Sequence, residues 1–142
     1  MCFIGYKDNL KVADRDIKCY KCLQSNMKSP CYETEYEIGK DMKSLFTFER
    51  LDDSFRGVLK IKKGLHSFIS IETAKRRAKS ELWWYNQVFM TAASSPIVVE
   101  CIIPKGSQYL TNGIEYVSDH LKPIKVVYNH RNLMSININY QL

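Results

Sequence analysis

The stretch that decides the fold is the last third of the chain, where three β-rich segments follow one another across two turns. It begins with Pro96-Ile-Val-Val-Glu-Cys-Ile-Ile103, a nearly continuous apolar run that indicates a largely buried strand. Two turns are predicted next, at Pro104-Lys-Gly106 and at Asn112-Gly113. Each contains a glycine, which accepts the positive φ that such turns require. Glu115 stands just after the second turn, and Pro123-Ile-Lys-Val-Val-Tyr128 predicts a further strand. This part of the chain therefore predicts strands joined by tight turns, with one carboxylate beside a turn.

The length and composition indicate one globular domain spanning residues 1–142. A chain of 142 residues has the usual size of a domain, and a hydrophobic fraction of 45% is enough for a buried core. No stretch approaches the roughly 18 apolar residues that a membrane helix needs, so we expect no membrane association. Five cysteines, an odd number, argue for reduced thiols rather than a disulfide framework. We therefore expect a cytoplasmic protein.

Before this segment, the clearest strand pattern is Asp16–Leu23, in which side chains alternate between two faces. The first face would carry Ile17, Cys19, Lys21 and Leu23, and the second Lys18, Tyr20 and Cys22. Residues 57–64 predict another strand that ends at a glycine. Residues 31–38 and 45–48 are candidates for short strands, and 135–140 for a last one.

One amphipathic helix is clear in the sequence. Ser70 is a good N-cap, and Glu72 suits the positive end of the helix dipole. Its apolar face would carry Ile71, Ala74, Ala78 and Leu82, and the helix would continue towards Trp83-Trp84-Tyr85. Many strands with one clear helix predict an α+β domain.

Cys19-Tyr-Lys-Cys22 has the spacing of a zinc-binding pair. Structural zinc needs two such pairs, and no second pair exists in the sequence. Two residues three apart on a strand also face opposite sides of the sheet. We therefore expect buried cysteines and no metal.

The basic segment Lys75-Arg-Arg-Ala-Lys79, near Trp83-Trp84-Tyr85, is a candidate for binding nucleic acid. The net charge of +6 is compatible with contacts to phosphates. The same charges would also suit a solvated helix face that keeps the protein soluble. Both interpretations stay open.

Three short blocks occur in a familiar order: Cys19-Tyr20-Lys21, then Gly64-Leu-His-Ser-Phe-Ile-Ser70 before the helix, then Asn112-Gly-Ile-Glu-Tyr-Val117. This order resembles that of ADP-ribosyltransferase-like domains over residues 17–128. The resemblance implies a split, strand-rich core within the α+β class, and a small bacterial or phage member of the family.

The resemblance also implies a site for NAD or a related nucleotide. The residues it assigns to binding are Tyr20, Lys21, His66, Ser67 and Ser70. Glu115 matches the glutamate that stabilises the positive charge developing on the ribose as nicotinamide leaves. Lys21 replaces the family's arginine or histidine, and Gly113 replaces a second glutamate or glutamine that many members carry. Transfer to an arginine is therefore not expected.

Several functions remain open from the sequence. The first is a nucleotide-binding ADP-ribosyltransferase or NAD glycohydrolase. The second is a non-enzymatic binding or interaction protein, such as a phage or mobile-element accessory factor, that engages a protein partner or a nucleotide. The third is a nucleic-acid binder. Ser70 could simply cap the helix, and Glu115 could simply be an exposed strand residue.

Overall fold

The computed structural model describes residues 4–6, 9–29, 34–50, 58–80 and 96–129. The first strands are β1 (Ile4–Tyr6), β2 (Lys11–Val12), β3 (Ile17–Gln24), β4 (Met42–Lys43) and β5 (Thr47–Arg50). They are followed by β6 (Val58–Lys63), β7 (Leu65–Phe68) and the helix α1 (Ile71–Lys79). The last strands are β8 (Pro96–Ile103), β9 (Gln108–Thr111), β10 (Glu115–Ser118) and β11 (His120–Asn129).

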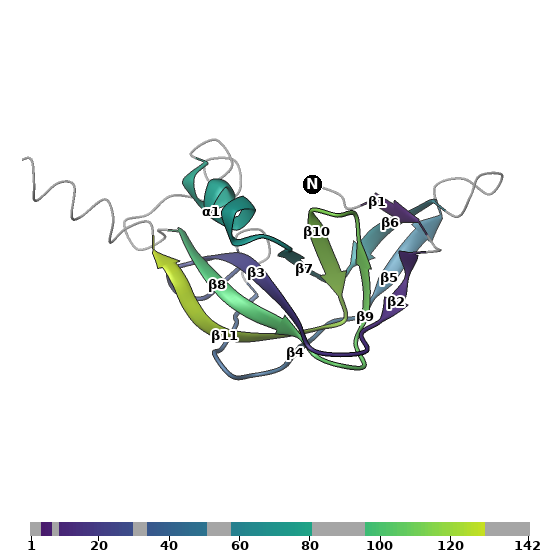
Figure 1. The fold of residues 1–142 in the computed structure, drawn as a ribbon, viewed down its shortest axis with the longest axis horizontal. Helices are drawn as coiled ribbons and strands as arrows, with labels where there is room; N and C mark the ends of the chain where they lie inside the picture. Colours follow the sequence, from purple (N-terminus) through teal and green to yellow (C-terminus); the bar gives the residue numbers. More distant parts are fainter. Residues whose placement is uncertain (1–3, 7–8, 30–33, 51–57, 81–95, 130–142) are drawn as a thin grey trace, which may run out of the picture.

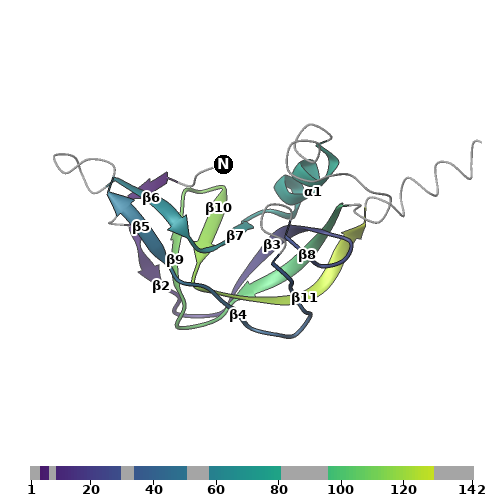
Figure 2. The same cartoon turned by 180° about the vertical axis from the view of Figure 1, so that it is seen from behind.

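A large sheet of eight strands forms the body of the protein, in the order β2-β9-β10-β7-β3-β8-β11-β4. A second, three-stranded sheet has the order β1-β6-β5, and all neighbouring strands in both sheets are antiparallel. The helix α1 lies at the β3, β8 and β11 end of the large sheet, and the small sheet lies at the β9 and β10 end (Figures 1 and 2). Gly64 alone separates β6 in the small sheet from β7 in the large one.

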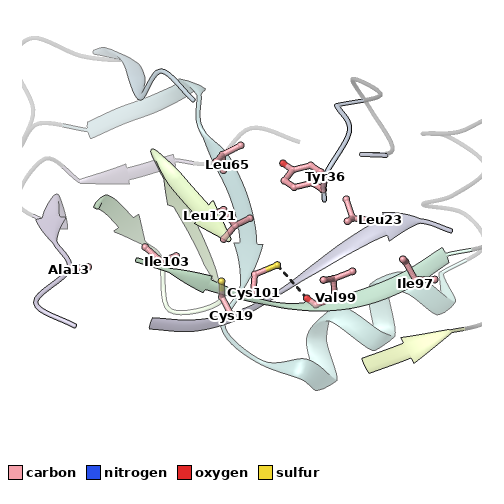
Figure 3. Close-up of a cluster of buried hydrophobic side chains, with 10 residues drawn as sticks. All are labelled: Ala13, Cys19, Leu23, Tyr36, Leu65, Ile97, Val99, Cys101, Ile103 and Leu121. Carbon is pink, nitrogen blue, oxygen red and sulfur yellow. Dashed lines mark hydrogen bonds between the residues drawn. The ribbon is translucent and has the colours of Figure 1, made fainter. Parts of the chain in front are cut away.

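One face of the large sheet, which we call the core face, carries the main hydrophobic cluster (Figure 3). Cys19 and Cys101 are directly opposite each other on β3 and β8, and both are fully buried. Tyr36, from the segment between β3 and β4, packs against this cluster. The remaining buried members are Ala13, Leu23, Leu65, Ile97, Val99, Ile103 and Leu121.

The opposite face, which we call the helix face, is covered in two places. At one end, Ala74 and Ala78 of α1 pack against Cys22 and Val98. The small alanines allow the helix to come close enough for the Cys22 thiol to donate a hydrogen bond to the Ala74 carbonyl, at 3.0 Å. At the other end, Ile61 of the small sheet packs on Val117 and Leu110.

The prediction of an α+β class with a split core is wrong. The described residues contain one helix of nine residues, and most of the remainder is strand in one large antiparallel sheet, so the fold is nearly all β. Strand β7 was the harder one to find. Leu65–Phe68 has only four residues, and the helix that follows it hid their pattern.

Several local predictions are confirmed. Strand β3 has the predicted alternation, because Cys19 and Leu23 pack in the core face whereas Tyr20 and Cys22 pack under the helix. The helix begins after Ser70, and strands occupy the expected places at 58–63, 96–103 and 120–129.

Other local predictions fail or lie outside the described residues. A strand does not form at 34–38, where Glu35 makes only an isolated bridge to Lys28. The strand expected at 45–48 does form, but two residues later, as β5 (Thr47–Arg50). The helix does not continue from Lys79 towards Trp83 as expected, because Ser80 has an extended backbone and caps it. The predictions for residues 31–33, Leu82, Trp83-Trp84-Tyr85 and 135–140 fall outside the described residues.

Candidate functional site

Four side chains form a row across the central strands on the helix face. Glu115 of β10 is directly opposite Phe68 of β7, and Phe68 is directly opposite Tyr20 of β3. Tyr20 is in turn directly opposite Glu100 of β8. Directly opposed residues on neighbouring strands project to the same face. We call Glu115, Phe68, Tyr20 and Glu100 the cross-strand row.

The row lies between the two layers that cover the helix face. Tyr20 and Phe68 pack against the cluster under α1. Val117, two residues beyond Glu115 on β10, packs under the small sheet. Glu115, Phe68 and Tyr20 are half-buried, so each keeps some contact with solvent. The row therefore offers two aromatic rings between two carboxylates.

Charges border the row on the helix side and on β3. The guanidinium carbon of Arg77 lies 5.7 Å from the centre of the Phe68 ring, within the range of a cation–π contact. The Lys18 ammonium lies 3.8 Å from a carboxylate oxygen of Glu100, which is 15% exposed. Cations thus stand near the row at Phe68 and at Glu100.

The turn before β10 fixes the backbone of Glu115. The side-chain oxygen of Asn112 accepts hydrogen bonds from the backbone N–H groups of Ile114, at 2.9 Å, and Glu115, at 2.8 Å. Gly113 has φ of 89°, a conformation that glycine adopts without strain. The Thr111 hydroxyl donates to the Glu115 carbonyl at 2.9 Å. The carboxylate therefore projects from an anchored position at the beginning of a strand.

His66 lies on β7, on the same face as Phe68, because it is directly opposite Val117. Burial lowers the pKa of His66 to about 4, and the nearby Lys21 ammonium lowers it further. The imidazole is therefore neutral at physiological pH.

Lys21 lies on the core face, since it is directly opposite Val99. Its ammonium donates a hydrogen bond to the His66 carbonyl at 2.6 Å and stands 5.2 Å from the centre of the Tyr36 ring. The amine ties β3 to β7 and stabilises the packing of the segment that covers the core face. It is on the opposite side of the sheet from Tyr20.

Ser67 is also on the core face, directly opposite Tyr116, and it is 2% exposed. Its hydroxyl makes no hydrogen bond of ordinary geometry within the part of the chain that the structure describes. The hydroxyl is nevertheless close enough to the Cys19 thiol to lower the pKa of that thiol, although burial has the larger effect and raises this pKa to about 11. Ser67 is thus part of the core rather than of the cross-strand row.

Ser70 caps α1, as its position in the sequence indicates. Its hydroxyl oxygen accepts hydrogen bonds from the backbone N–H groups of Glu72, at 3.1 Å, and Thr73, at 3.5 Å. Its hydrogen-bonding capacity is therefore largely engaged in stabilising the helix.

Of the six residues expected at the site, the structure brings Tyr20, His66 and Glu115 to the helix face. Lys21 and Ser67 lie on the core face, and Ser70 caps the helix. Phe68, Glu100 and Arg77 adjoin the expected residues and were missed. A signal for Glu100 was present in the sequence, because it is the single charge within the apolar run of β8.

The Cys19–Cys22 pair does not form a metal site. Cys19 packs in the core face and Cys22 under the helix, so the two thiols point to opposite sides of the sheet. Within the described ranges, no three His, Cys, Asp or Glu side chains gather closely enough to hold a metal ion.

Comparisons with protein-family models, curated proteins and solved structures found no match. The helix in the described part of the chain is too short and too polar to cross a membrane.

Proposed function

We propose that this protein binds NAD or a related nucleotide at the cross-strand row. The observation that carries the proposal is the strand register. It aligns Tyr20, Phe68 and Glu115 on one face, although these residues come from three blocks far apart in the sequence. The same three blocks carry the resemblance to ADP-ribosyltransferase-like domains, and their strands are neighbours in the order β10-β7-β3.

The chemistry of the row suits such a ligand. Aromatic faces stack against flat heterocycles, and Tyr20 and Phe68 offer two rings side by side. Arg77, next to Phe68, supplies a fixed positive charge for a phosphate. The Glu115 carboxylate can accept hydrogen bonds from ribose hydroxyls.

If the nicotinamide ribose lies at Glu115, the carboxylate would stabilise the cation that develops on the sugar. The bond between ribose and nicotinamide would break, and nicotinamide would leave with the bonding electrons. Water would then add to the ribose and lose a proton to solvent. This is a glycohydrolase reaction. We propose a cytoplasmic location for it, in keeping with the free thiols of Cys19, Cys22 and Cys101.

A second candidate is a non-enzymatic binding protein that uses the same surface without chemistry. One observation favours it: Lys21, at the position of the family's arginine or histidine, points into the core face. An enzyme of this family would then lack the cation that the strand equivalent to β3 is expected to contribute to its site.

The two candidates separate in one experiment. NAD is titrated into wild-type protein and into Glu115→Gln by calorimetry, and nicotinamide release is followed in parallel. The enzyme predicts binding by both proteins and turnover by the wild type alone. The binding protein predicts binding by both and turnover by neither. Absence of binding at millimolar NAD would overturn the proposal in both forms.

A further inference from the structure

We propose that a second surface, formed by α1 and β11, binds single-stranded nucleic acid. We call it the basic–aromatic surface and define it by Lys75, Lys79, Lys122, Lys125 and Tyr128. It adjoins the cross-strand row, because Lys125 is directly opposite Glu100, but none of its residues is needed for the proposed nucleotide site.

Strand β11 arranges its basic residues in a line on the helix face. Lys122, Lys125 and Tyr128 are three residues apart, a spacing that would normally alternate between faces. Two register shifts in β11, between Pro123 and Lys125 and between Val126 and Tyr128, correct this spacing. The three residues are therefore opposite Ile102, Glu100 and Val98 of β8, which are two apart and share one face.

The helix adds two lysines next to this line. The Lys75 and Lys79 ammonium groups lie 5.9 Å and 5.6 Å from the centre of the Tyr128 ring. Lys79, Lys122 and Lys125 are exposed, and Tyr128 is half-buried. One turn of helix separates Lys75 from Lys79, so both approach the same ring. Lys75 and Lys79 thus lie beside the Tyr128 ring, and Lys125 and Lys122 continue the line of charge along β11, away from that ring.

The combination favours single-stranded nucleic acid over other polyanions. Proteins that bind single strands pair cations along the backbone with aromatic rings against which bases stack. An acidic peptide or an anionic membrane would use the cations but has no flat base to place on Tyr128. Glu100, opposite Lys125, is already paired with Lys18 at 3.8 Å.

The test is fluorescence anisotropy with a labelled single-stranded oligothymidine, repeated over a range of salt concentrations. Because phosphate contacts release counterions, affinity should fall steeply with salt, and removing one lysine–phosphate ion pair should reduce the logarithmic slope by about 0.7. We expect Lys79→Ala and Lys125→Ala each to weaken binding and to reduce the slope by this amount. Lys63→Ala is the matched control, because it removes one exposed charge from the small sheet, at the other end of the molecule.

Tyr128→Leu tests the ring without changing the charge. It should weaken binding but leave the salt slope unchanged, and a thermal melt of the same variant confirms that it is folded. Equal losses of affinity in Lys63→Ala and Lys79→Ala would overturn the proposal, because net charge alone would then explain binding. Failure to bind the oligonucleotide at low salt, or a preference for anionic phosphatidylserine vesicles, would overturn it as well. NAD titration of Lys79→Ala separates the two sites, since the proposed nucleotide site should be unaffected.

Discussion

At the scale of single residues, position on one or the other face of the sheet decides what each side chain can do. Tyr20 and Lys21 are adjacent in the sequence, yet one lies beside Phe68 in the cross-strand row and the other ties the core face to β7. The alternation of β3 already predicted that they would separate. A ligand on one face of the sheet can therefore use Tyr20 but not Lys21.

His66 should make stability depend on pH. The folded protein binds a proton at His66 only near pH 4, whereas an unfolded histidine binds one near 6.5. As the pH falls below 6.5, the unfolded chain takes up the proton first, so stability is full above that value and is lost towards pH 4. The loss from this group should approach about 3 kcal/mol, because each pKa unit corresponds to about 1.4 kcal/mol.

The measurement is urea unfolding at a series of pH values for wild-type protein and for His66→Gln. Carboxylates also titrate in this range, so the difference between the two proteins is the informative quantity. That difference should change between pH 6.5 and 4 and be constant above. A constant difference across the whole range would show that His66 titrates normally in the folded state.

The buried cysteines should be unreactive. Burial raises the pKa of Cys19 to about 11 and that of Cys22 to about 12, with Lys21 opposing the shift in both cases. The reactive thiolate is therefore scarce at pH 8. Iodoacetamide labelling followed by peptide mass spectrometry should find both residues unmodified in the folded protein and fully modified in urea. Rapid labelling of Cys19 without denaturant would contradict its placement in the core.

At the scale of elements, the helix depends on its cap. Replacing Ser70 by alanine removes the acceptor for the Glu72 and Thr73 N–H groups, at a cost of about 1 kcal/mol of unfolding free energy. Ser70→Asp keeps an acceptor and serves as the control. Chemical denaturation of the three proteins measures the effect. If Ser70→Asp is as unstable as Ser70→Ala, the hydroxyl does not act as a cap.

Gly64 is where the chain passes from the small sheet to the large one. A Cβ at this position would overlap the Cγ1 atom of Val117 on β10. Gly64→Ala should therefore destabilise the protein by about 1–3 kcal/mol, as overpacking of a core does. In a Val117→Ala background, Gly64→Ala should cost less unfolding free energy than it does in the wild-type protein. A double-mutant cycle measures this difference. Additive effects would show that the two positions do not meet.

Elements with strong local signals could be predicted from the sequence. Residues next to one another in the sequence determine each of these features. They are the alternation of β3, the apolar run of β8, the cap at Ser70 and the glycine turns. Strand β7 could not be recognised as readily. It has only four residues, alternately buried and half-buried, and it forms because β3 and β10 pair with it on either side. The α+β prediction failed for this reason, since neighbours across the sheet create such short strands.

At the scale of the whole molecule, the site depends on strand register, which the sequence does not contain in any local form. Glu115, Phe68 and Tyr20 come together because β7 pairs with both β10 and β3. The order of the three blocks in the sequence indicated Glu115 and Tyr20. Phe68 and Glu100 were missed because their importance comes from what lies opposite them.

The molecule as a whole has two candidate binding regions on the helix face. The cross-strand row lies between the small sheet and α1, and the basic–aromatic surface lies beyond it at α1 and β11. Both are positioned by the same central strands.

The central claim is that a nucleotide lies against Tyr20, Phe68 and Glu115. Its most direct test is a nuclear Overhauser measurement between bound NAD and the aromatic protons of the protein. The account predicts contacts from the adenine or nicotinamide protons to the Tyr20 and Phe68 rings, which disappear in Tyr20→Ala with Phe68→Leu. It also predicts none to Tyr36, on the core face. Contacts to Tyr36 instead, or none at millimolar NAD, would contradict it.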